Sequence, residues 1–149
     1  MDDLSPVLDQ IIRSIWDTTL GLPIVRVPGD PVPSWTEPPL TASVEITGQW
    51  HGRVILSTPE ALVHRIARHL FGSEPATLER SDLEDSLREL VNITGGNLKS
   101  CLPQPCHLAL PVMVRPDEEK SPSLEPGASA ACRLSFVCEE QPLMVTVCP

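Results

Sequence analysis

The chain has 149 residues, with 11 lysines and arginines against 20 aspartates and glutamates, which gives a formal net charge of −9. This length suits a single domain over residues 1–149 that buries roughly 70% of its unfolded surface. The acidic balance argues against nucleic acid as a partner, because phosphate backbones are recognised by lysine and arginine. It also argues against an anionic membrane surface, and no apolar run reaches the roughly 18 residues that a membrane helix needs.

The N-terminal stretch, MDDLSPVLDQ, is acidic and lacks the apolar segment of a signal peptide. We therefore expect a cytoplasmic protein with reduced thiols. The five cysteines are Cys101, Cys106, Cys132, Cys138 and Cys148. Cys106 and His107 follow Cys101 closely, but no second cysteine or histidine pair completes four metal ligands. The sequence therefore predicts no metal site and no cofactor of the protein's own.

The first half of the chain alternates between helical and strand patterns. Residues 5–20 have apolar side chains at helical spacing up to Gly21, which predicts a leading helix. After a proline-rich connection, residues 40–58 alternate apolar and polar side chains, which predicts a β-hairpin. Residues 59–71 predict a second helix that ends at Gly72. Its buried side is predicted to hold Ala61, Leu62, Ile66, Ala67 and Leu70.

The second half begins with a long helical pattern over residues 81–100. Residues 106–114 are a strand candidate, and Pro111 places it at an edge or a bulge. Residues 115–129 have the composition of a mobile loop. Residues 131–148 contain two apolar runs around EEQP and predict a closing hairpin. Strand runs separated by two adjacent helices predict an α+β fold, with those helices and the leading helix packed on a mostly antiparallel sheet.

The helix over residues 81–100 starts well but is weak in its second half. Ser81 and Glu84 are predicted to form a capping box at its start. Its apolar stripe should pack on the sheet and consists of Leu83, Leu87, Leu90, Thr94, Leu98 and Leu102, with Val91 on its flank. Two consecutive glycines, Gly95 and Gly96, cost about 2 kcal/mol relative to alanine. Either they admit another element of the same chain, or Gly96 admits the backbone of a partner.

The outer face of this helix holds the candidate site residues. Glu89 and Asn92 lie three positions apart, so their side chains are neighbours on the solvent face. Asp85, Gly96 and Lys99 share that face and are the predicted partner-binding residues. A lysine near a helix C-terminus also complements the helix dipole, which is the simpler role for Lys99.

The stretch ELVNITGGNLKS resembles the signature helix of the CheX-like chemotaxis phosphatases, relatives of CheC and FliY that dephosphorylate the response regulator CheY. The order of elements is similar as well. The resemblance implies that Asn92 orients a water for in-line attack on the phospho-aspartate of a CheY-type receiver. It implies that Glu89 contacts the receiver and holds its conserved lysine, and that the receiver supplies Mg²⁺. Thr94 and Gly95 depart from the family pattern and are expected to loosen the helix.

The sequence contains one Glu-x-x-Asn motif of this type, which is more like CheX than like CheC. CheX acts as a homodimer joined through its sheet, so the resemblance implies a homodimer here. The closing hairpin is expected to supply the edge, although pairing within the monomer explains that hairpin equally well.

The chemistry of an acyl phosphate fits this division of roles. The bond is already reactive, so a phosphatase needs mainly to position water without repelling the phosphoryl group. A neutral amide such as that of Asn92 can do both.

Two other functions stay open at this point. A non-catalytic module of the same fold could dock a receiver or a motor-switch protein without hydrolysis, and it would not need Glu89 and Asn92 together. An unrelated enzyme would need a base, for which the histidines are the candidates. They are His51, His64, His69 and His107, and neither His64 nor His69 has an obvious serine or aspartate paired with it.

Overall fold

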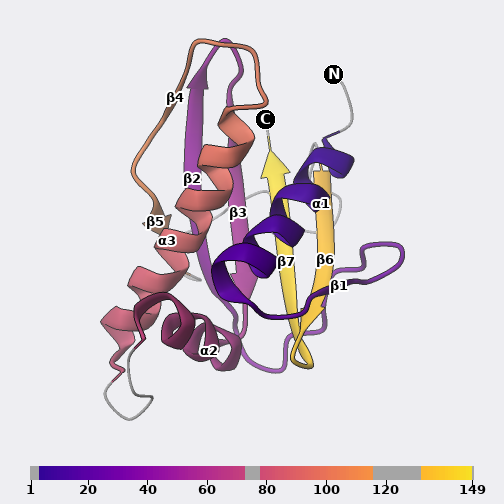
Figure 1. Ribbon diagram of the computed structural model, residues 1–149, viewed down its shortest axis with the longest axis vertical. Helices are drawn as coiled ribbons and strands as arrows, with labels where there is room; N and C mark the ends of the chain where they lie inside the picture. Colours follow the sequence, from indigo (N-terminus) through magenta and orange to yellow (C-terminus); the bar gives the residue numbers. More distant parts are fainter. Residues whose placement is uncertain (1–3, 73–77, 116–131, 149) are drawn as a thin grey trace.

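One antiparallel sheet with helices on one of its faces makes up the described part of the molecule, residues 4–72, 78–115 and 132–148 of a computed structural model (Figure 1). The strand order is β1-β6-β7-β3-β2-β4, and β5 pairs with β2 on the same side as β4. Every strand pair is antiparallel. The predicted α+β fold, with a leading helix and two adjacent helices on a mostly antiparallel sheet, is confirmed.

The leading helix has the predicted extent, but its last part is wider than an α-helix. α1 spans Ser5–Ser14 and continues into the π-helical segment η1, Ile15–Leu20. Gly21 ends it with a φ of 66°. Trp16 in η1 is fully buried, and its indole nitrogen donates a hydrogen bond to the Cys138 sulfur at 3.2 Å. Burial raises the pKa of the Cys138 thiol, so this cysteine acts as a small, protonated core residue.

The predicted hairpin and the helix after it are both confirmed. β2 (Leu40–Gly48) pairs with β3 (Gly52–Thr58), and α2 follows as Glu60–Phe71. The buried side of α2 consists of Leu62, Val63, Ile66 and Ala67. The prediction for Ala61 was wrong. The side of the helix that faces the core is formed by residues 62, 63, 66 and 67, and Ala61 faces solvent. Leu70 is half-buried.

Two short strands form the outer edge of β2. They are β4 (Cys106–Leu108) and β5 (Val112–Met113), and the chain leaves the ladder between them around Pro111. Proline has no N–H for a sheet ladder, which explains the break. The predicted edge position of this strand is confirmed. The predicted mobile loop, residues 115–129, lies outside the described residues apart from Arg115.

The closing hairpin is formed as predicted but lies inside the sheet. β6 (Cys132–Cys138) and β7 (Gln141–Cys148) pair with each other, and β7 also pairs with β3. On its other side β6 pairs with β1 (Val25–Arg26). One residue further along β6, the Asp30 carboxylate accepts the Ser135 N–H at 3.0 Å. β1 and Asp30 therefore cover part of the outer edge of the closing hairpin, the edge that was expected to meet a second copy.

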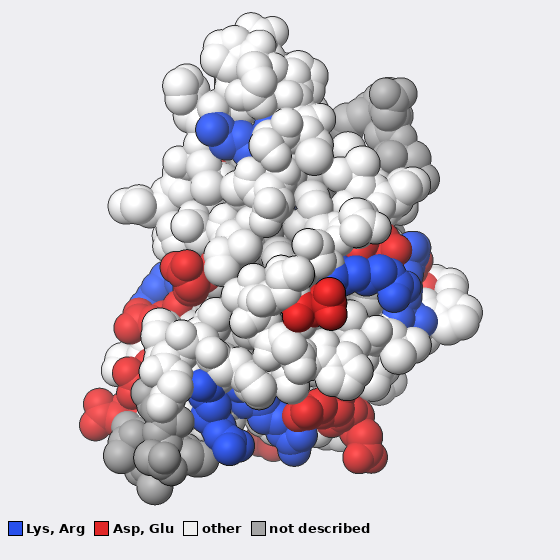
Figure 2. Space-filling view, viewed as in Figure 1, with Lys and Arg blue, Asp and Glu red and all other residues white. Residues whose placement is uncertain are grey.

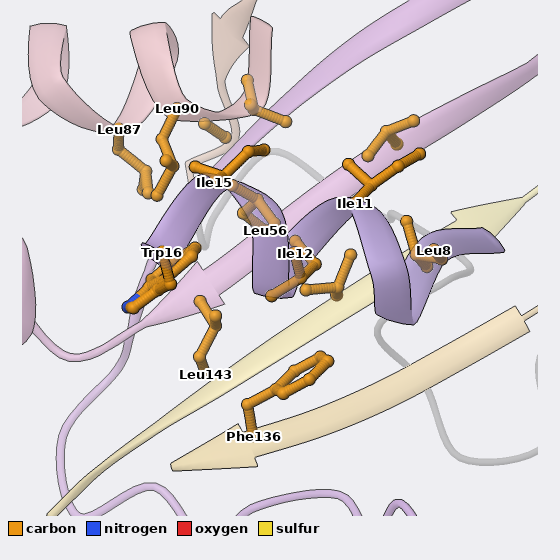
Figure 3. Close-up of a cluster of buried hydrophobic side chains, with 14 of the residues drawn as sticks. Leu8, Ile11, Ile12, Ile15, Trp16, Leu56, Leu87, Leu90, Phe136 and Leu143 are labelled. Atoms are coloured by element: carbon orange, nitrogen blue, oxygen red, sulfur yellow. The ribbon is translucent and has the colours of Figure 1, made fainter. Parts of the chain in front are cut away.

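The apolar core fills the space between the helices and the sheet (Figure 3). Ile12 and Trp16 from the leading helix, Leu87 from α3, and Leu56 and Phe136 from the strands converge there, all fully buried. Each such burial contributes roughly 1.5–3 kcal/mol. The core fixes which face of α3 points inward, and this determines which face remains for function.

Candidate functional site

All five predicted site residues lie on α3, Arg80–Lys99, the long helix that runs over β2 in Figure 1. Its N-cap is Glu79, whose backbone N–H donates to Asp82 Oδ2 at 2.8 Å, so these two residues form the capping box. The capping box predicted for Ser81 and Glu84 was wrong, because the Glu84 carboxylate is engaged by arginines instead. The N-cap therefore lies two residues before the predicted one.

The inward stripe of α3 is confirmed. Its buried members are Leu83, Leu87, Leu90, Val91, Thr94 and Leu98, and Leu102 is buried just beyond the helix end. The hydroxyl of Thr94 donates to the Leu90 carbonyl oxygen at 2.8 Å. A buried hydroxyl that is satisfied this way carries no desolvation penalty, so Thr94 packs as part of the stripe.

The two glycines have different surroundings. A Cβ added to Gly95 would lie 2.6 Å from Val44 Cγ1 and 3.1 Å from Leu108 Cδ1, so α3 sits on the sheet at a distance that only glycine allows. A Cβ added to Gly96 would meet only Leu108 Cδ2, at 3.9 Å. Packing within the chain therefore explains Gly95, whereas the described residues impose no such need on Gly96. Gly95 brings the helix close to the sheet, and this is the role that the expectation of a loosened helix missed.

Most polar side chains in the second half of α3 bond to the helix itself. The Asn97 amide donates to the Ile93 carbonyl at 3.0 Å, and the Ser100 hydroxyl donates to the Asn97 carbonyl at 2.7 Å. Glu89 is exposed and Asn92 is half-buried, and neither side chain makes a hydrogen bond or ion pair with any described residue. Their carboxylate and amide therefore remain available to something outside the described chain.

A cluster of arginines surrounds Glu84, one turn before this pair. The Glu84 carboxylate lies 3.0 Å from Arg115 Nη1, 3.5 Å from Arg80 Nε and 4.0 Å from Arg88 Nη1. Its side chain is only 13% exposed. The hydrogen bond from Arg115, opposed by partial burial and assisted by Arg80, lowers the pKa of Glu84. The cluster ties the end of β5 to α3 and keeps this glutamate ionised.

Of the residues predicted to bind a partner, Asp85 is the one already engaged. Asp85 is exposed and pairs with Arg88 on the next turn. Lys99 is half-buried and has no ion pair among the described residues. Arg88 was not among the predicted residues, although its spacing of four residues from Asn92 places the two side chains side by side on the helix. Figure 2 shows charged side chains over α2, over the first turns of α3 and on the side of α1 and β1, with a mostly uncharged surface above them.

The histidines do not assemble into a second site. His51 Nε2 lies 3.2 Å from Glu45 Oε2 in the β2–β3 hairpin, His64 and His69 lie on α2, and His107 lies on β4. Among the residues that the structure describes, no three histidine, cysteine, aspartate or glutamate side chains come together as a metal site requires. In the same part of the chain, no helix is long and apolar enough to cross a bilayer.

The fold and α3 together define a class of protein: an antiparallel sheet covered on one face by a helix that presents a glutamate and an asparagine side by side. Residues 40–133, more than half of the chain, match the family model described as chemotaxis phosphatase CheX. The chain therefore belongs to the CheX family of chemotaxis phosphatases. No curated protein sequence matches it significantly.

Solved structures show the same fold. The chemotaxis protein CheX from Vibrio vulnificus is 17% identical, with a TM-score of 0.71 over 99% of this chain and 96% of that one. A CheC-like superfamily protein from Shewanella is 14% identical, with a TM-score of 0.71 over 99% and 98%. The third is a CheX–CheY–BeF₃–Mg²⁺ complex from Borrelia burgdorferi, which is 17% identical with a TM-score of 0.72 over 99% and 97%.

Proposed function

We propose that this protein is a phosphatase for the phosphorylated aspartate of a CheY-type receiver domain, in which Asn92 positions the attacking water. The observation that carries the proposal is the pair of Glu89 and Asn92 on the outer face of α3, in a member of the CheX family, with neither side chain bonded to a described residue. The Borrelia relative that was solved with CheY, BeF₃ and Mg²⁺ supports a receiver as the partner.

Each residue has a chemical task in this proposal. The Asn92 amide accepts a hydrogen bond from water and donates toward the phosphoryl oxygens, and it adds no negative charge that would repel them. Glu89 binds a cationic side chain of the receiver and so fixes the docked pose. Mg²⁺ belongs to the phosphorylated partner and neutralises charge on the phosphoryl group there. This chain positions the water and holds the receiver in the docked pose.

The residues around the pair complete the proposed docking surface. Gly96, one turn after Asn92, has no side chain that would keep a partner's backbone away from the helix. Lys99 lies two turns after Asn92, and Asp85 one turn before Glu89. We also propose that the protein is a homodimer and works in a chemotaxis pathway of the cytoplasm, in line with the family.

A phosphorylated receiver from the same genome tests the proposal. The wild type should speed loss of phosphate well above the receiver's own rate, and Asn92→Ala should remove at least 100-fold of that acceleration, since misplaced water loses the benefit of positioning. Glu89→Ala should mainly weaken docking. Asn97→Ala, which alters an amide bonded to its own helix, is the matched control and should retain activity.

Two results would oppose the proposal in different ways. If the wild type binds the phosphorylated receiver without speeding its decay, the protein is a docking module and the water-positioning role of Asn92 is wrong. If it neither binds nor hydrolyses any receiver, the partner class itself is wrong.

A further inference from the structure

We propose that Arg88 is a further partner-contacting residue, which faces the negative charge of the phosphorylated site on docking and is held by Asp85 until then. This inference rests on the proposed function and deepens it, because it names a residue that would set affinity for the phosphorylated form. It also gives Asp85 a role different from direct contact with the partner.

The first ground is the position of Arg88 around the helix. Arg88 precedes Asn92 by four residues, so the two side chains are neighbours about 6 Å apart along the axis. At about 100° per residue, Arg88 lies about 40° to one side of Asn92 and Glu89 about 60° to the other. The water-positioning amide would therefore be flanked by a cation and an anion on opposite sides.

The second ground is the way Arg88 is held. Its guanidinium bonds to Asp85 through Nη2, and its other contact is Glu84 at 4.0 Å. Glu84 is engaged more closely by Arg115 at 3.0 Å and Arg80 at 3.5 Å, so it does not depend on Arg88. Asp85 is thus the main partner of Arg88 among the described residues, and Arg88 is the only ion-pair partner of Asp85 there.

The third ground is that Arg88 can leave Asp85 for another negatively charged group. The side chain of Asp85 is 58% exposed and that of Arg88 is 31% exposed, and ion pairs exposed to this extent are weak because water screens them. A phosphoryl group carries more negative charge than a carboxylate and offers three oxygens to a planar guanidinium. Once docking excludes water, Arg88 would gain by leaving Asp85 for the phosphorylated site, where charge spreads over the transferring oxygens.

Two single substitutions should change kcat/KM in opposite directions, which distinguishes this arrangement from an ion pair with a purely structural role. With the phosphorylated receiver as substrate, Arg88→Ala should lower kcat/KM about tenfold, and Arg88→Lys should recover part of that loss because it keeps the charge but not the fork. Asp85→Ala should raise kcat/KM two- to fivefold, because it releases the guanidinium. The double variant should match Arg88→Ala. Arg68→Ala removes a positive charge from α2 where no ion pair is described, and it should leave kcat/KM unchanged.

Two readouts exclude a merely structural effect. Arg88→Ala and Asp85→Ala break the same ion pair, so their melting temperatures should shift alike while their kcat/KM values move in opposite directions. Raising the salt concentration should lower kcat/KM less steeply for Arg88→Ala than for the wild type, since one charge contact has been removed.

The outcomes for this inference differ from those for the proposed function. If Asn92→Ala is inactive but Arg88→Ala is unaffected, or if Asp85→Ala and Arg88→Ala fall together, the role of Arg88 is wrong and the phosphatase proposal stands. If the wild type binds without hydrolysing, affinities for the receiver loaded with BeF₃ and Mg²⁺ should show the same opposite signs. If the wild type neither binds nor hydrolyses, both ideas are wrong.

Discussion

At the scale of single residues, the two adjacent glycines of α3 make the sharpest prediction for stability. Gly95→Ala should lower the free energy of unfolding by about 1–2 kcal/mol, because the added methyl overlaps Val44 by more than the gain in helix propensity offsets. Gly96→Ala should raise it by about 0.5–1 kcal/mol, since that methyl makes only an ordinary van der Waals contact with Leu108. Urea unfolding of both variants measures the contrast.

A double substitution shows whether Val44 is the cause. In a Val44→Ala background the methyl of Gly95→Ala fills the vacated space, so the cost of the glycine substitution should fall to near zero or change sign. If both glycine variants instead stabilise the protein equally in the wild-type background, α3 does not pack as closely on β2 in solution as the structure shows. Gly96→Ala should also weaken receiver binding, which would separate stability from function at one position.

The same residue scale explains what could and could not be predicted from the sequence. Leu87, Leu90 and Leu98 were placed inward correctly, because a 3.6-residue period is visible in the letters alone. The different roles of Gly95 and Gly96 were not visible, since they depend on where Val44 of another element lies. Glu89 and Asn92 were placed correctly on the outer face of α3, their role in a site stays a prediction, and the contact between Arg88 and Asp85 was not considered.

At the scale of elements, one carboxylate reinforces the backbone pairing of β1 with β6. Asp30 accepts hydrogen bonds from Arg26 Nε at 2.9 Å, from Arg26 Nη2 at 2.6 Å and from the Ser135 N–H at 3.0 Å. It has a φ of 47°, a conformation that aspartate tolerates better than most residues. We call these hydrogen bonds of Asp30 with Arg26 and Ser135 the clasp. The proline-rich composition around Asp30 predicted a connection but gave no sign of the clasp, in which Asp30 and Ser135 are 105 positions apart.

The clasp gives a pH dependence with a definite sign. The hydrogen bond from Arg26, and that from Ser135, lower the pKa of Asp30 below its ordinary value, against partial burial. A carboxyl whose pKa is lower in the folded state contributes stability that is fully present above the unfolded pKa and is lost as pH falls through the folded pKa. Asp30→Asn should therefore cost about 1 kcal/mol near pH 7, and the difference from wild type should shrink below about pH 4.

Unfolding of the wild type and Asp30→Asn across that pH range checks the prediction. Asp17→Asn, which changes an exposed aspartate with no described ion pair, should show no comparable dependence. A constant difference between wild type and Asp30→Asn from pH 7 to pH 3 would mean that the carboxylate charge does not hold β1.

At the scale of the whole molecule, the two edges of the sheet differ in what covers them. On one side β1 and the Asp30 carboxylate cover part of β6. On the other side β4 and β5 form the last pieces, and Leu110 and Val112 are 86% and 53% exposed there. Val112 belongs to β5 and Leu110 lies between the two strands, and exposed apolar side chains at the edge of a sheet favour contact with another chain. This moves the expected contact of the proposed homodimer from the closing hairpin to the opposite edge of the sheet.

A two-fold contact along this edge would extend the sheet and would bury both copies of Leu110 against each other, because a two-fold axis brings the same patch of each subunit together. Leu110→Glu places two like charges at that contact and should weaken the dimer at least tenfold in sedimentation equilibrium. Val25→Glu, at an apolar position that is 66% exposed on the opposite edge, is the matched control and should not. If only the control dissociates the dimer, the β1 edge is the interface, and if the wild type is monomeric at every concentration, the homodimer proposal is wrong. Since α3 contacts β2 and both edge strands, a dimer joined along β4 and β5 would bring the second copy close to the helix that carries Asn92.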